Sequence, residues 1–200
     1  MIDKLKESPE MRTLYLVTSI SAFFFVTFNF IFYMMFEPIS DLFYINYFGF
    51  RFDFEFGGSQ HIIHTIMNTY YYDWYLAESI HNILFVDYFY IISRSVLLFC
   101  LALFITRIFS NKSYYGDIGY KITVFPIIAG FLDIVENIAT TLLLNLVMNQ
   151  NFDNNYSIII FICACIKFIL ILVTIMWIVI GTLMTLAIKT NDENYALDVQ

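Results

Sequence analysis

Four long runs of apolar residues organise the chain, and shorter polar segments separate them. The runs cover about residues 14–36, 82–109, 122–148 and 157–188. Each run is long enough for a helix to cross roughly 30 Å of hydrocarbon, which takes about 20 residues. The pattern therefore predicts an all-α membrane protein: four antiparallel transmembrane helices in a bundle, forming a single domain over residues 1–190, with a disordered tail over 191–200.

The first loop, residues 37–81, is the sizeable polar stretch between the apolar runs. After Gly57-Gly58-Ser59, where Ser59 is a suitable helix N-cap, apolar residues recur at three- and four-residue spacing: Ile62, Ile63, Ile66, Met67 and Tyr70. This spacing is typical of an amphipathic helix. We therefore predict a short amphipathic helix that lies on the extracytoplasmic face of the bundle.

The lysines and arginines that flank the apolar runs predict the orientation. Seven of them lie in the two tails and in the loop between the second and third runs: Lys4, Lys6, Arg12, Arg107, Lys112, Lys121 and Lys189. The first loop contains only Arg51, and the third loop contains none. Because cytoplasmic loops are enriched in basic residues, both termini are expected in the cytoplasm. The sequence does not indicate which membrane holds the protein.

Composition supports membrane insertion and excludes several other classes. Hydrophobic residues make up 60% of the chain, charged residues 14%, and the mean hydropathy is +0.73, so the lipid bilayer is the expected surrounding. The net charge is −7, and the sequence contains no cluster of basic residues. Both observations argue against nucleic acid as a partner. The histidine pair His61 and His64 could form a metal site with His81, Asp53 and Glu55, but their spacing matches no known metal motif, so we expect no metal and no cofactor.

Five ionisable residues lie inside the apolar runs. Leaving all of them unpaired in hydrocarbon would cost on the order of 12–17 kcal/mol, at about 2.5–3.5 kcal/mol each. Such residues normally pair with one another or line a water-filled cavity. The five residues are Asp87 and Arg94 in the second run, Asp133 and Glu136 in the third, and Lys167 in the fourth.

The spacing of these residues predicts one intramembrane polar cluster. Asp133, Glu136 and Asn137 share a helix face because they lie three and four residues apart. Asp87 and Arg94, seven apart, also share a face. Because successive helices are expected to run in opposite directions, counting residues inward from the outer membrane boundary at about 1.5 Å each places most of these groups at a similar depth in the membrane. The predicted cluster therefore contains the five ionisable residues of the three spans together with Asn137: Asp87, Arg94, Asp133, Glu136, Asn137 and Lys167.

Three functions are compatible with such a cluster. The chain could be a non-enzymatic protein of unknown role in which the cluster supports structure, interaction with a membrane partner, or ligand binding. It could be a small proton- or ion-linked transporter, acting as a homo-oligomer because four spans are few. It could also be a membrane-embedded enzyme or binder of a lipid or sterol, with Asp133 or Glu136 as general acid. Phosphate-binding loops and nucleophile motifs are absent, so the sequence favours the first.

The third run also carries a family resemblance. Residues Pro126 to Asn137, "PIIAGFLDIVEN", resemble small four-span membrane proteins, mostly bacterial, whose third span has a proline followed by D-x-x-E-N. The stretch "VDYFYIISR", Val86 to Arg94, fits the aspartate and aromatic that begin the second span of that group. Phe52-Asp53 before the predicted amphipathic helix has a counterpart there as well. The resemblance implies a four-helix membrane fold and no established activity.

Overall fold

The computed structural model describes residues 5, 9–43, 74–109, 113–148 and 154–198. Five segments of this described part are helices, and none of its residues forms a strand. The helices are α2 (Met11–Phe43), α5 (Trp74–Phe109), α6 (Ser113–Ile122), α7 (Phe125–Met148) and α8 (Asn154–Asp198). The prediction of an all-α protein is confirmed for this part of the chain, whereas the amphipathic helix predicted after Ser59 lies outside it.

Four helices of the described part are long and apolar enough to cross a membrane. Their candidate spans are Met11–Met35, His81–Ile108, Tyr115–Leu143 and Asn155–Leu186. These spans agree with the four apolar runs of the sequence, except that the third begins earlier because α6 precedes α7. The predicted number of helices that are long and apolar enough to span a membrane is therefore confirmed.

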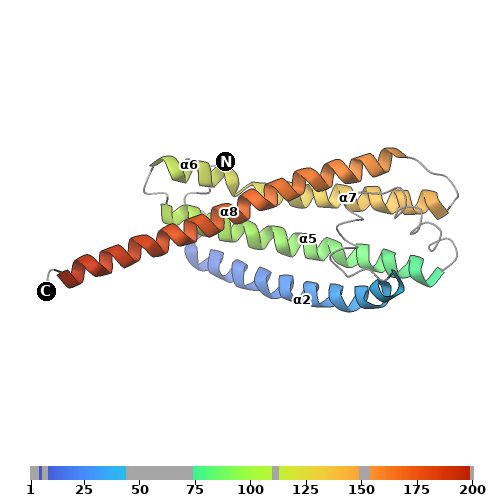
Figure 1. The fold of residues 1–200 in the computed structure, drawn as a ribbon, viewed down its shortest axis with the longest axis horizontal. Coiled ribbons are helices and arrows are strands. Elements are labelled where there is room, and N and C mark those ends of the chain that lie inside the picture. The colour runs from blue at the N-terminus through green and yellow to red at the C-terminus, as the bar shows by residue number, and fades with distance from the viewer. Residues whose placement is uncertain (1–4, 6–8, 44–73, 110–112, 149–153, 199–200) are drawn as a thin grey trace.

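The helices lie side by side, with α5 in contact with all the others. Helix α2 packs along α5, α7 packs along both α5 and α8, and α5 also contacts α8. Successive long helices run in opposite directions (Figure 1). Apolar packing between α2 and α5 centres on Leu14, Cys100 and Leu103, and that between α7 and α8 centres on Ala139, Leu143 and Ile160.

Helix α6 was not expected, because residues 110–121 read as a loop. Pro126 explains why α6 and α7 are separate helices: it has no N–H, and its ring would collide with the carbonyl of Ile122 if one helix continued through it. The chain instead turns at Thr123, whose hydroxyl donates to the Tyr120 carbonyl at 2.8 Å. Pro126 then falls in the first turn of α7, where a missing N–H costs nothing.

Helix α6 is held against the end of α5 and the middle of α8 by a close contact at Gly119. A Cβ atom built on Gly119 would lie 2.5 Å from Cζ2 of Trp177 and 2.6 Å from Oγ1 of Thr106. The same two side chains are joined by a hydrogen bond, in which the Trp177 indole donates to Thr106 Oγ1 at 3.0 Å. Only glycine fits at this three-helix junction.

Helix α8 is longer than the fourth apolar run. It continues through Asp198, into the segment 191–200 for which we predicted a disordered tail, and it projects past the other helices at its carboxyl end (Figure 1). The residues that follow Lys189 include no proline and no glycine. Nothing in the local sequence therefore ends the helix before Asp198.

Candidate functional site

Lys167 is the centre of a buried charge network between α7 and α8. Its ammonium Nζ lies 2.7 Å from Oδ1 of Asp133 and 2.8 Å from Oε2 of Glu136. The lysine and both acids are almost fully buried, with exposed fractions of 1%, 1% and 3%. Because Asp133 and Glu136 are three residues apart, they share one face of α7, and a single cation of α8 reaches both.

Arg94 extends the network to α5. Its guanidinium Nη2 donates to Oδ2 of Asp133, so that the two oxygens of this carboxylate accept from two cations on two different helices. Arg94 also lies over the ring of Tyr90, 5.4 Å from its centroid, at a distance that favours a cation–π interaction. Asp133 thus connects α5, α7 and α8. We refer to Arg94, Asp133, Glu136 and Lys167 as the charge network.

Asp87 and Asn137 form a neighbouring polar contact between α5 and α7. The amide Nδ2 of Asn137 donates to Oδ2 of Asp87 at 2.7 Å, and both side chains are buried. Asn137 is four residues beyond Asp133 and hence on the same face of α7. The structure therefore places all six polar residues singled out from the sequence on facing sides of α5, α7 and α8.

Small residues let the three helices approach closely around these contacts. Ala129 and Thr140 on α7 and Ala164 on α8 are buried, and each is three or four residues from a member of the charge network on its own helix. At Gly130 the helix α7 lies so near α5 that an added Cβ would collide with the hydroxyl of Ser95. Close approach through small residues is common between membrane helices, and here it brings side chains of ordinary length within ion-pair distance.

The charges of the network balance, with two cations and two carboxylates. Ion pairs removed from water must offset a large desolvation penalty, so such a network adds little stability compared with apolar packing. Removal of one charged side chain from the network, however, leaves an uncompensated charge in the interior, which is strongly unfavourable. The arrangement therefore suits a role in fixing how α5, α7 and α8 are aligned.

The described cavities do not reach the six polar residues. A cavity of about 620 Å³ lies between α2, α5 and α7, and one of about 230 Å³ lies between α2 and α5. Neither is lined by Asp87, Asn137 or any member of the charge network. Asp133 and Glu136, the two candidates for a general acid, face cations and line neither of these two cavities.

Metal ligands do not gather in the described part of the chain. No group of three or more His, Cys, Asp and Glu side chains there could hold a metal ion. His61, His64, Asp53 and Glu55 lie outside the described residues. The cysteines Cys100, Cys163 and Cys165 are free thiols.

Sequence reasoning missed the aromatic contacts that connect α2 to the site. Tyr90, beneath Arg94, stacks on Phe25 at 5.5 Å between centroids and meets Phe32 edge-on at 5.5 Å. Two polar residues of α2 instead form hydrogen bonds within their own helix: Thr18 donates to the Leu14 carbonyl and Asn29 to that of Phe25. Because 20% of the residues are aromatic, the sequence did not distinguish Tyr90 from the other aromatic side chains.

Comparisons of the chain with protein-family models, with curated proteins and with solved structures give no match. The resemblance of residues 126–137 to small four-span membrane proteins therefore stays a prediction.

Proposed function

We propose that the chain is a non-enzymatic, four-span integral membrane protein in which the charge network aligns the helices of an antiparallel bundle. Its role is then one of structure, interaction or ligand binding within the membrane. The observation that supports this most directly is the position of Lys167, which is 1% exposed and lies within 2.8 Å of two carboxylates of the neighbouring helix.

The pairing of the charges favours this function over ion or proton transport. A carrier needs ionisable groups that exchange protons or ions with water on both sides of the membrane. Here Asp133 meets Arg94 and Lys167 together, and Glu136 meets Lys167. The neighbouring cavity of about 620 Å³ has almost entirely apolar walls and does not touch these groups.

Proton flux in vesicles distinguishes alignment from transport. We expect purified protein in liposomes with an imposed pH gradient to dissipate the gradient no faster than protein-free liposomes, because the charge network has no described connection to either cavity. A pH-sensitive dye inside the liposomes measures the rate, and a protonophore added at the end shows that the gradient was intact. A protein-dependent flux that Glu136→Gln abolishes would contradict the proposal and favour a proton-linked carrier.

The distribution of lysine and arginine supports a topology with both termini in the cytoplasm. Epitope tags at the two termini should then become accessible to antibodies together, only after the membrane of whole cells is permeabilised. Tags that are accessible in intact cells, at either terminus, would contradict this topology. A tag in the first loop, for example after Gly58, provides the control because it should be accessible without permeabilisation.

A further inference from the structure

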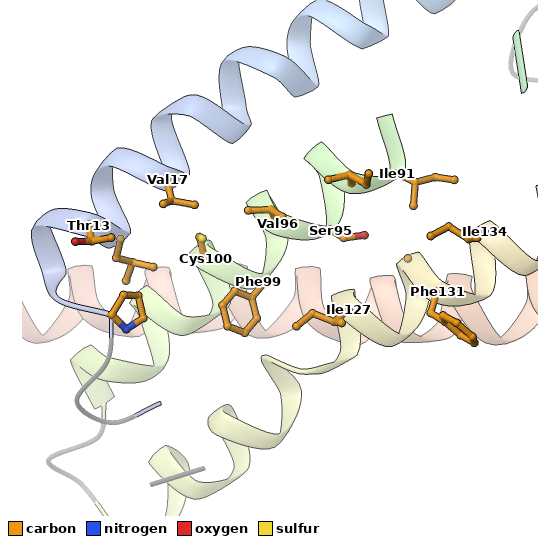
Figure 2. Close-up of a pocket in the computed structure, with 14 residues that line it drawn as sticks. Thr13, Val17, Ile91, Ser95, Val96, Phe99, Cys100, Ile127, Phe131 and Ile134 are labelled. Atoms are coloured by element: carbon orange, nitrogen blue, oxygen red, sulfur yellow. The ribbon is translucent and has the colours of Figure 1, made fainter. Parts of the chain in front are cut away.

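A groove separate from the charge network lies between α2, α5 and α7 (Figure 2). Its volume of about 620 Å³ falls within the range of small-molecule binding sites, about 300–1,000 Å³. Its walls are apolar except for the hydroxyls of Thr13 and Ser95 and the thiol of Cys100. The Ser95 hydroxyl is itself buried where α5 meets α7, so the groove offers few groups to a polar ligand.

The groove opens sideways. Helix α2 packs along α5 but not along α7 to a comparable extent, which leaves a gap between α2 and α7 with α5 as its floor. Ile127 and Phe131, which line the groove from α7, are 52% and 65% exposed. In a bilayer this opening would face the acyl chains. An empty apolar space loses the dispersion contacts of its lining atoms, so the groove favours an apolar occupant.

The length of the groove matches one leaflet. The lining residues of α5 lie between Ile91 and Cys100, ten residues whose nine steps span about 13.5 Å of helix. One leaflet contributes about 15 Å of hydrocarbon, half of the roughly 30 Å core. A transmembrane helix from a second copy of the chain would need a groove about twice as long, whereas a single acyl chain is confined to one leaflet.

Cationic groups lie at one end of the groove, where its lining residues Pro9 and Thr13 are found. Arg12 is exposed beside Thr13. The guanidinium of Arg107 lies at the same end, donating to the Pro9 carbonyl at 2.6 Å. Glu10, which is also exposed, places a carboxylate two residues before Arg12 in the sequence. Arginine is well suited to hydrogen-bonding a phosphate group, and an exposed arginine at the end of an apolar groove is what a phospholipid headgroup would meet.

We propose that this groove binds one acyl chain of a membrane phospholipid, which enters between α2 and α7 with its headgroup at the end marked by Arg12 and Arg107. The site is independent of the function proposed above, because no member of the charge network lines the groove. Loss of the charge network and loss of lipid binding can therefore be observed separately.

Photolabelling tests the site with a phosphatidylcholine that carries a diazirine in one acyl chain. The protein is placed in phosphatidylcholine nanodiscs, and labelled peptides are identified by mass spectrometry. We expect the labels to concentrate on groove residues such as Val17, Cys100 and Ile127. Val17→Phe should reduce this labelling about tenfold, the loss expected when a ring takes the space of roughly two methylene groups.

Matched controls separate filling of the groove from a general effect of phenylalanine. Val26→Phe makes the same change on α2 at a 66% exposed position outside the groove and should leave the labelling unchanged. Ile127→Phe and Ile138→Phe form a second matched pair on α7, in case Val17→Phe does not fold. Equal labelling within both pairs, labels spread evenly around α2, preferential labelling of the groove by a diazirine sterol, or covalent dimers joined through groove residues would each overturn the proposal.

Discussion

Replacing Lys167 with methionine should lower the free energy of unfolding by about 3–5 kcal/mol, the range found when one partner of a buried ion pair is removed. Methionine has a similar length and no charge, so the substitution creates little empty space. It removes the ammonium group that lies 2.7 Å from Asp133 and 2.8 Å from Glu136. Two negative charges of α7 then share Arg94 alone within the charge network, in an interior that cannot solvate them.

Unfolding of the protein in mixed micelles, followed by circular dichroism, measures this effect. Lys121→Met is the matched control, because Lys121 is an exposed lysine on α6 and its replacement should leave unfolding nearly unchanged. If Lys167→Met were as harmless as Lys121→Met, the charge network would not be holding the helices. The ion pairs would then be incidental to the stability of the fold.

Gly119→Val should destabilise the protein by about 3 kcal/mol, at the upper end of the range for overpacked interiors. An alanine in place of a helical glycine normally stabilises by about 0.5–1 kcal/mol, so the intrinsic preference of the backbone opposes this outcome. The close contact nevertheless makes the net change in the free energy of unfolding destabilising, because the new Cβ would lie 2.5 Å from the Trp177 ring and 2.6 Å from the Thr106 hydroxyl. The hydrogen bond between those two side chains would be displaced as well.

A graded series tests this junction by thermal unfolding in detergent. Gly119→Ala should be destabilised less than Gly119→Val, since it adds one carbon rather than three. Combining Gly119→Ala with Trp177→Leu should cost less than the two single changes together, because leucine vacates the space of the indole ring. Full stability of Gly119→Val, or strictly additive effects in the double variant, would show that α6 does not pack on α5 and α8 in this way.

The shared helix face of the polar residues on α7 could be predicted from the sequence, whereas their partners on the other helices could not. Asp133, Glu136 and Asn137 share a helix face in any α-helix, and hydrocarbon requires such groups to find partners. Which partners they find depends on how the helices are aligned, and that is fixed by long-range packing. Asp87 and Arg94 illustrate the limit: seven residues correspond to about 10.5 Å of helix, too far for an ion pair, and the structure joins Asp87 to Asn137 and Arg94 to Asp133.

Helix α6 shows a second limit of the sequence. Its ten residues contain two glycines and no apolar run, so its local preference for helix is weak. The helix is stabilised instead by tertiary contacts: Tyr120 is 1% exposed in the cluster with Leu14 and Leu103, and Gly119 adjoins Trp177. These contacts depend on the positions of α2, α5 and α8, which the local sequence of α6 does not specify. By contrast, the long apolar runs predicted the four helices that are long and apolar enough to span a membrane without tertiary information.

The interaction energy between Lys167 and Asp133 tests the central claim most directly. Unfolding free energies of the wild type, Lys167→Met, Asp133→Asn and the double variant give this energy as the departure from additivity. Because the two changes together remove one charge of each sign from the network, we predict that the double variant recovers part of the stability that each single change loses. Additive losses would contradict the account, since they would mean that the lysine of α8 and the aspartate of α7 do not meet inside the protein.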